Sequence, residues 1–583
     1  MALIKESSKS ASERPGLATG GLVAAMLTAV LISVFYLAWK VVGLPFVPFD
    51  AFDWMARILP GQVLAAGIDA MITVIRAFNL GPTAAAAKTA EHVMAIAGMF
   101  FMGLFGGTIL FSIIRAVRGR YAVILGLALG IALGIPLQLI SQRVGQTAST
   151  GPELSAIWVV GALLLWGATL GWADQRLLAG GSTVLGAGPA GQPARGDTAE
   201  RIDRRHFLVR LGGATAVVTV IGAVVGELSE VMRKRVSGVT AKDLLWSSTH
   251  PLPNADAAVK PVPGTRPEFT PLERHYRIDI DTIPPVVNPQ RWRLNVDGLV
   301  EKPLTLTLDE LRRFEPMHQF ITLSCISNPV GGDLIGTTRW TGVSLQQLLP
   351  SLRLQAGATH LKIHAADEFY EIVSLETIRS DERVMLTYAW DGVPLLPEHG
   401  FPLRIYIPDL YGMKQPKWIE SIEVTDHWEP GFWVIRGWDK VARMTATSVI
   451  DTVAVDMTII NADRRRLVPI GGIAHAGARG ISKVELQVDD GPWQEAALRT
   501  PLSRLTWSVM SGLSSRVNTP LLCVVTKTAV HPRSARPVLS SPVVRVRRAR
   551  RSRGLFGYRA SCDCCRGFHN GGCASALSLQ CDP

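Results

Sequence analysis

Long apolar runs in the first 226 residues constrain the fold of this chain more than any other feature of its sequence. A run of about 20 apolar residues is long enough to cross a bilayer as an α-helix. Four runs reach or approach this length and a fifth is shorter: Gly21–Val42, Val93–Ile114, Tyr121–Ile140, Ala156–Trp172 and Leu211–Gly226. The sequence therefore predicts a membrane domain of about five transmembrane helices over residues 1–230.

Basic residues beside these runs orient the predicted helices, because lysine and arginine concentrate in the cytoplasmic loops of membrane proteins. Lys5, Lys9 and Arg14 precede the first run, and three arginines separate the second run from the third. The N-terminus is therefore expected inside the cell. Five crossings then place the chain after about residue 230 on the outer, periplasmic face of the plasma membrane.

Two weaker apolar segments refine this prediction. Asp69 and Arg76 interrupt the segment Leu64–Phe78, which favours an amphipathic helix at the membrane surface. The sequence DRRHFLV at residues 203–209 precedes the fifth run and resembles a twin-arginine export signal, the alternative being that its arginines are ordinary cytoplasmic charges. No small-x-small cleavage site follows, so we expect this segment to remain as an anchor.

The distribution of charge argues against a nucleic-acid partner. The formal net charge is +12, but the residues from His531 onward hold ten arginines and two aspartates, which leaves only about +4 for the rest of the chain. Domains that bind nucleic acid gather their basic residues on one face. Six of the seven cysteines also lie beyond residue 522. We expect residues 513–583 to form an atypical, disordered Arg/Cys-rich tail, either read in a changed frame or unrelated to what precedes it.

Between the membrane domain and this tail, the chain changes character twice. Six prolines between residues 251 and 271 predict an extended linker over 231–275. Residues 276–440 alternate short apolar strands with short helices, which predicts a mixed α+β domain. From about residue 445 the pattern becomes all-β, with a DDGPW turn after an alternating VELQV strand. A small β-sandwich is therefore expected over 445–512.

Five motifs follow one another in the α+β region. They are YRID (276–279), LSC (323–325), TTRWTGVSLQQLL (337–349), LPEHGFPLRIYIP (396–408) and LYGMKQPKWI (410–419). In this order and spacing, the region resembles the sulfite oxidase family of molybdopterin-dependent oxidoreductases, in a membrane-anchored bacterial form. The resemblance implies a sulfite-oxidase-type molybdopterin domain over 276–440. It also implies an immunoglobulin-like, dimerisation-type sandwich, which the altered tail would leave incomplete, and it leaves a homodimer open.

The resemblance also implies a molybdenum–molybdopterin cofactor and oxygen-atom transfer coupled to a two-electron redox change. A soft thiolate suits molybdenum, and Cys325 stands at the metal-binding position of the family. Arg277 and Tyr370 are the other catalytic candidates. The candidates for binding the cofactor, chiefly cationic and polar side chains, are Asn328, Arg339, His399, Arg404, Lys414 and Lys417. Structural interpretations compete: a buried cysteine, an Arg339–Trp340 core pair, a strand cap at His399, an edge strand at Lys417–Trp418 and a core tyrosine at Tyr370.

The residues after Cys325 leave the substrate open. They read ISNPV, where sulfite oxidases carry arginines that help to hold an anion. Asn328 would instead face a polar pocket for a neutral S-oxide, so sulfite oxidation and S-oxide reduction both remain. The first 226 residues hold only His92 and His206, and no C-x-x-C-H motif occurs, so no haem is expected and electrons would pass to or from a separate partner. The alternative function is a cofactor-free extracytoplasmic binding module on the same scaffold.

Overall fold

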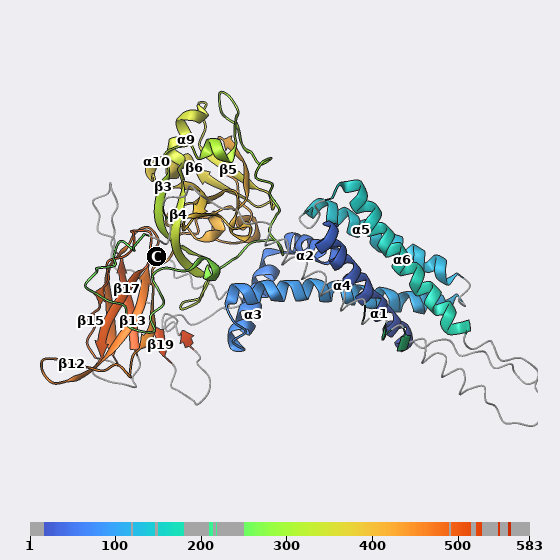
Figure 1. Cartoon of the computed structure of the whole chain (residues 1–583), viewed down its shortest axis with the longest axis horizontal. Helices are drawn as coiled ribbons and strands as arrows, with labels where there is room; N and C mark the ends of the chain where they lie inside the picture. Colours follow the sequence, from blue (N-terminus) through green and yellow to red (C-terminus); the bar gives the residue numbers. More distant parts are fainter. Residues whose placement is uncertain are drawn as a thin grey trace, which may run out of the picture. The chain divides into compact units, whose positions relative to one another are not determined.

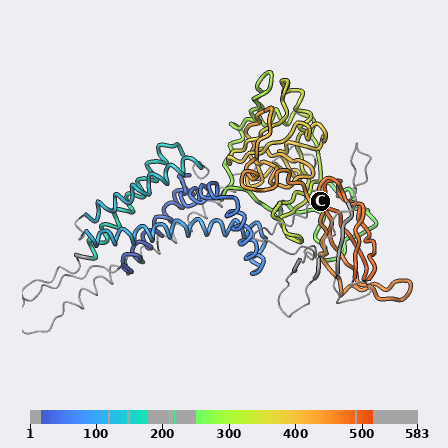
Figure 2. Tube along the Cα trace, turned by 180° about the vertical axis from the view of Figure 1, so that it is seen from behind, coloured from blue at the N-terminus to red at the C-terminus, as the bar shows by residue number. Residues whose placement is uncertain are grey.

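The computed structural model describes residues 17–117, 121–145, 150–179, 250–488, 491–514 and 521–527, together with two short strands near the C-terminus and a few isolated positions. The chain forms two units. The first holds the N-terminal helices and the segment Asp279–Val286, and the second holds Asn79–Ala85, Ala241–Ile278 and everything from Val287 onward. Figure 1 draws the N-terminal helices in blue to teal and most strands of the second unit in green to orange, and Figure 2 shows the chain from behind as a tube in the same order of colours.

Four helices of the first unit are long and apolar enough to cross a membrane. They are α1 (Leu17–Val42), α4 (Thr83–Ala116), α5 (Ala122–Val144) and α6 (Pro152–Ala179), and they confirm the four longer predicted runs as helices. The fifth predicted segment, Leu211–Gly226, lies almost wholly outside the described residues. The amphipathic segment forms α3 (Gly61–Ala77), and α2 (Val47–Ile58) was not predicted.

Glycines bring α5 and α6 into backbone contact. A Cβ atom at Gly126 would lie 2.0 Å from the carbonyl oxygen of Gly167, and one at Gly167 would lie 2.1 Å from that of Gly126. Close approach of this kind lets membrane helices pack without a hydrophobic driving force. The spacing of Gly126, Gly130 and Gly134 keeps the seam on one face of α5, because residues four apart lie one above the other on a helix.

We expect Gly167→Leu to separate α5 from α6 and to destabilise the folded unit by about 3 kcal/mol or more, since overpacking against backbone cannot relax by side-chain rotation. The measurement is the apparent melting temperature of the full chain in detergent. The matched control is Gly161→Leu on the same helix, where a Cβ atom would meet no described heavy atom within 4 Å. An equal loss of stability in both variants would contradict the seam.

Buried charges join α2 and α4 to the segment Asp279–Val286 within the first unit. Arg57 Nη2 lies 2.7 Å from Asp281 Oδ1, and Lys88 Nζ lies 2.8 Å from Asp279 Oδ1. Asp53 accepts a hydrogen bond of 3.0 Å from the Thr282 backbone N–H and another from its hydroxyl. Burial raises the pKa of Asp53 to about 7, despite these hydrogen bonds and the nearby lysine and arginine.

This raised pKa predicts a pH-dependent stability. The folded state holds the Asp53 proton more tightly than the unfolded chain, whose value is 3.8, so stability should be greatest at low pH and fall as pH rises towards 7. We expect Asp53→Asn to flatten this decline in the apparent melting temperature between pH 4 and pH 8. Asp297→Asn, at an exposed position of β1, should leave it unchanged. An identical decline in Asp53→Asn and the unaltered protein would show that Asp53 does not cause it.

A mixed sheet and an antiparallel sheet share the core of the α+β region in the second unit. The first runs in the order β2 (Leu304–Leu306), β1 (Leu294–Gly298), β10 (Ile419–Thr425), β5 (His360–Ala365) and β6 (Tyr370–Ser374). The second runs β3 (Met317–Ser324), β4 (Ile335–Ser344), β7 (Met385–Trp390) and β8 (Val393–Pro394), with β9 (Arg404–Tyr406) also paired to β7. Buried residues of both sheets and of the short helices α8 (Leu308–Leu311), α9 (Leu345–Leu352) and α10 (Leu375–Ser380) form one hydrophobic cluster.

Two further sheets face each other after residue 446. One contains β11 (Thr447–Val453), β12 (Ile459–Ile460), β13 (Arg466–His475), β16 (Ala497–Leu498) and β17 (Ser508–Ser514), and the other β14 (Ile481–Val488), β15 (Gln494–Glu495) and β18 (Leu521–Lys527). Ile470, Val484 and Met510 pack between them. Strand β18 extends this region beyond the predicted boundary at residue 512. Two short strands, β19 (Val546–Arg548) and β20 (Tyr558–Ala560), pair with each other.

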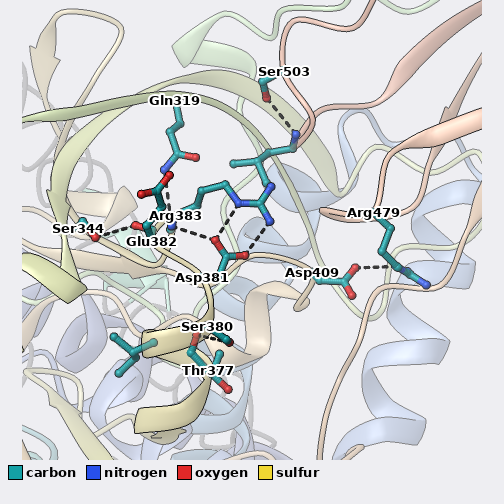
Figure 3. A network of polar contacts seen from close by, with 12 residues as sticks. Gln319, Ser344, Thr377, Ser380, Asp381, Glu382, Arg383, Asp409, Arg479 and Ser503 are labelled. Atoms are coloured by element: carbon teal, nitrogen blue, oxygen red, sulfur yellow. Dashed lines mark hydrogen bonds and ion pairs between the residues drawn. The ribbon is translucent and has the colours of Figure 1, made fainter. Parts of the chain in front are cut away.

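The two facing sheets (the sandwich sheets) and their connecting loops contact the α+β region at strand β3 and at Asp409. Thr322 donates its backbone N–H to the carbonyl of Leu505 at 3.0 Å, and Arg479 reaches Asp409 at 3.0 Å (Figure 3). The later part of the predicted linker is packed here as well. Glu268 pairs with Arg499 at 2.8 Å, and Thr270 donates to the carbonyl of Thr337 at 2.6 Å. A proline-rich segment can pack in this way because its remaining backbone groups find partners in neighbouring strands.

Candidate functional site

Cys325 lies directly after β3, at the start of the turn that leads into β4. Its backbone N–H donates to the carbonyl of Leu334 at 3.0 Å, and its carbonyl accepts from the N–H of Asn328 at 3.1 Å. The side-chain oxygen of Asn328 accepts from the Leu334 N–H at 2.9 Å. These bonds close the loop of residues 326–333 on itself and hold the thiol at the end of the hairpin.

The environment of the Cys325 side chain suits a thiolate whose negative charge is offset by a bound metal cation. Burial raises its pKa, while the nearby N–H and hydroxyl groups of Ser327 and the N–H of Ile326 act in the opposite direction. These three groups favour the thiolate but do not outweigh burial. A bound metal ion supplies the missing positive charge and removes the proton outright.

Tyr276, a half-buried residue, brings a hydroxyl to the same place. A Cβ atom on Gly412 would lie 3.3 Å from this hydroxyl and 3.5 Å from the carbonyl oxygen of Ser324, the residue before the cysteine. Burial and, next, the charge of Cys325 raise the pKa of Tyr276 well above its ordinary value. The phenol is therefore held protonated beside the thiol. The sequence pointed to Arg277, the next residue, which is half-buried.

A group of cationic and imidazole side chains lies around the tryptophans Trp340 and Trp390. Arg404 Nη1 donates to the carbonyl of His399 at 3.2 Å, and its guanidinium lies 5.0 Å from the Trp340 ring centre. The His399 ring lies 4.4 Å from Trp390 and 5.6 Å from His275. Burial, and then the charges of Arg404 and Lys417, lower the pKa of His275 to about 3, so this ring is neutral.

Gly400 permits this cluster to close. Its φ of +105° is unfavourable for any other residue, and a Cβ atom there would lie 3.0 Å from that of Lys417 and 3.2 Å from that of Arg404. Arg404 and Lys417 therefore both lie against Gly400 of the HGFP segment. Lys417 Nζ also donates to the carbonyl of Glu398 at 3.1 Å.

The electrostatics of this cluster indicate an anionic ligand. Arg404 is 5% exposed, and burial lowers its pKa to about 10. Within the described residues, no carboxylate forms an ion pair with it, and the buried Nε2 of His275 has no hydrogen-bond partner. Buried charges in proteins are usually paired or bound to a ligand. A phosphate-bearing, polar molecule would satisfy both groups.

Two residues that were predicted to bind the cofactor form ion pairs and do not belong to the cluster around Trp340 and Trp390. Arg339, next to Trp340 on β4, pairs with Asp391 at 2.7 Å, because successive side chains of a strand point to opposite faces. Lys414 pairs with Glu371 at 3.0 Å, and both side chains are buried.

Tyr370 and Asn328 also have other neighbours. Tyr370 belongs to β6 in the other sheet, with Lys362 Nζ 5.4 Å from its ring centre. The side-chain oxygen of Asn328 accepts a hydrogen bond from Leu334 at the end of the same loop. Sequence reasoning missed His275, Tyr276 and Ser327. The only signal for the first two was their place beside Arg277, and Ser327 carried none.

Comparison with known proteins decides the family. Residues 281–433 match the model of the oxidoreductase molybdopterin binding domain. The uncharacterized oxidoreductase YuiH of Bacillus subtilis is 31% identical over 148 residues, which are 25% of this chain and 72% of that protein. This chain belongs to the sulfite oxidase family. It is an oxidoreductase, and its matching domain is a molybdopterin-binding one.

Two further relatives differ in the activity that their names give. A sulfite oxidase of Arabidopsis thaliana is 26% identical over 274 residues, 39% of this chain and 70% of that protein. The putative protein-methionine-sulfoxide reductase subunit YedZ1 of Azospira oryzae is 29% identical over 153 residues, 26% of this chain and 56% of that protein. The relatives of this chain thus include one named as a sulfite oxidase and one named as a putative subunit of a sulfoxide reductase.

Proposed function

We propose that this sulfite oxidase family member binds molybdenum–molybdopterin with the residues around Cys325 and acts as a membrane-anchored oxidoreductase. Cys325 would hold the metal. Arg404 and Lys417 would hold the phosphate, and His275 and His399 the polar edges of the pterin. The observation that carries the proposal is the buried, carboxylate-free Arg404 beside an unpaired imidazole nitrogen. Once bound, the cofactor supplies a two-electron redox change coupled to oxygen-atom transfer.

The chain itself would then contribute three things. The polar groups of Ile326 and Ser327 near the Cys325 sulfur favour its thiolate form. The Tyr276 phenol, protonated at neutral pH, holds a proton beside the site. Trp340 and Trp390 line the cluster with apolar rings and exclude water from the cations, which strengthens their hold on a phosphate.

We propose a neutral S-oxide as the favoured substrate, reduced with two electrons and two protons to the sulfide and water. The loop of residues 326–333 carries no lysine or arginine. Arg266, which donates to the carbonyl of Gly332, is itself neutralised by Asp451 at 2.8 Å. An anion such as sulfite would find little positive charge there. The name of the Azospira relative agrees with this direction.

A direct comparison of substrates tests this proposal. The full chain, loaded with cofactor, would be assayed with methionine sulfoxide and a reduced dye, and with sulfite and an oxidised dye. We expect kcat/KM for the sulfoxide to exceed that for sulfite by at least about tenfold, the effect of about 1.4 kcal/mol in the transition state. Sulfite turnover at rates comparable to those of authentic sulfite oxidases would overturn the assignment.

We also propose that the helices place the catalytic region on the outer face. Within the helical unit, Gly20 of α1 packs on Phe111 near the end of α4, so these helices are antiparallel. The other end of α4 carries Lys88, which pairs with Asp279. The segment Asp279–Val286 thus lies at the end opposite the start of α1. Protease treatment of intact spheroplasts should cut the catalytic region and spare the N-terminus. Cleavage of the catalytic region only after lysis would contradict this orientation.

Electrons would be exchanged with a separate redox partner, since the helices carry too few histidines to hold paired haem ligands. We further propose that the two facing sheets are the immunoglobulin-like domain of the family. A homodimer through these sheets is the arrangement that the family resemblance favours. Sedimentation of the detergent-solubilised chain would test it, and a monomer at micromolar concentration would exclude it.

A further inference from the structure

The loop after Cys325 is held from outside the α+β region. Arg266, in the segment before the first strand, donates from Nη1 to the carbonyl of Gly332 at 3.1 Å. Its other guanidinium nitrogens grip Asp451 of β11, with Nη2 at 2.8 Å from Oδ1 and Nε at 3.0 Å from Oδ1 and 3.2 Å from Oδ2. The Arg266 backbone N–H donates to the same carboxylate at 3.1 Å.

The grip of Asp451 fixes the direction of the guanidinium. A fork-shaped pairing with one carboxylate leaves a single orientation for the remaining nitrogen, and that nitrogen meets the loop. The Asp451 side chain is 9% exposed, so solvent competes little for it. Val449, on the same strand, adds an apolar contact: its Cγ1 lies 3.6 Å from where a Cβ of Gly331 would be.

A short series of hydrogen bonds connects this clamp to the thiol. Gly332 donates its N–H to the carbonyl of Pro329 at 2.7 Å, and Leu334 donates to the Asn328 side chain at 2.9 Å. The Leu334 carbonyl in turn accepts from the N–H of Cys325 at 3.0 Å. Displacing Gly332 would therefore loosen the turn that begins at Cys325.

We infer that Arg266, oriented by Asp451 of the sandwich sheets, is a positioning residue for the loop of residues 326–333 and so for the substrate pocket beside Cys325. The sandwich thus completes the active site rather than serving only as a neighbouring module. This inference goes beyond the proposed function. Only its kinetic test rests on that function.

A second ion pair in the same unit provides a matched control. Asp409 of the α+β region meets Arg479 of the sandwich at 3.0 Å, as Figure 3 shows, and neither residue has a described hydrogen bond to the loop of residues 326–333. If Arg266 and Asp451 were an ordinary ion pair between sheets, breaking either pair would have the same consequences for the loop.

The first test is hydrogen exchange in the cofactor-free full chain. Arg266→Met and Asp451→Asn should each speed the exchange of the Asn328, Gly332 and Leu334 amides by at least about tenfold, which corresponds to about 1.4 kcal/mol of lost local stability. Asp409→Asn should leave them unchanged. Arg266→Lys, which keeps the charge but loses the fork, should lie between. Unchanged loop amides in both Arg266→Met and Asp451→Asn, or equal acceleration in Asp409→Asn, would overturn the inference.

The second test uses the loaded enzyme. Arg266→Met should raise KM several-fold with a smaller change in kcat, because the loop positions substrate and does not take part in the reaction. Arg266→Lys should recover part of the lost affinity. Failure of the proposed substrate to turn over in the unaltered enzyme would contradict the proposed function alone, since the exchange experiment does not depend on it.

Discussion

Replacement of Cys325 by serine is expected to remove molybdenum from the purified protein and to lower turnover by more than about a hundredfold. Loss of groups that only support a metal ligand costs about 10- to 100-fold, so loss of the ligand itself should cost more. Serine preserves the shape of the side chain but offers a hard oxygen in place of a soft thiolate. Elemental analysis and dye-linked turnover of the full chain measure the two effects.

The Ser327→Ala variant provides a graded comparison. It removes a hydroxyl that favours the thiolate and keeps the sulfur itself, so metal content should persist while turnover falls by a smaller factor. The two variants should have similar melting temperatures without cofactor, because each change is small and local. One molybdenum per chain in Cys325→Ser would rule out the proposed ligand, and metal-free unaltered protein that folds normally would favour the binding-module alternative.

The sequence predicted the parts of this site that lie in continuous motifs. Cys325, His399, Arg404 and Lys417 each belong to a segment with a recognisable pattern, and the structure places Arg404 and His399 at the neighbouring rings of Trp340 and Trp390. His275 reaches the same place from a separate segment. A contact between residues more than a hundred positions apart leaves no local periodicity, so the only sign of His275 in the sequence is its place beside Arg277.

Arg339 shows a second limit. It and Trp340 are neighbours in one motif, yet the pleat of β4 sends their side chains to opposite faces. The pattern indicated that one face of the strand meets the site without indicating which. Helix α2 was not predicted at all. It carries Asp53 and Arg57, whose buried partners, Thr282 and Asp281, lie more than 220 residues later and are not visible in the local pattern.

Replacing Arg404 by methionine is expected to have opposite effects on the cofactor-free and the loaded protein. Without cofactor, the guanidinium is buried, its pKa is lowered, and no described carboxylate pairs with it. Removing an uncompensated buried charge is neutral or stabilising, so the apparent melting temperature of the cofactor-free chain should stay constant or rise by a few degrees. Molybdopterin content after loading should fall at least about tenfold, since a charge-assisted contact to phosphate contributes 1.5–3 kcal/mol or so.

Arg339→Met is the matched control, and its expected result has the opposite sign in the cofactor-free chain. This guanidinium is equally buried but pairs with Asp391, so its loss strands a carboxylate and should cost about 3–5 kcal/mol of stability. The two variants therefore distinguish a buried cation that binds a ligand from a buried cation that stabilises the fold. Destabilisation of the cofactor-free chain by Arg404→Met to the same extent as by Arg339→Met, with cofactor content retained, would show that Arg404 supports the fold and does not hold the phosphate.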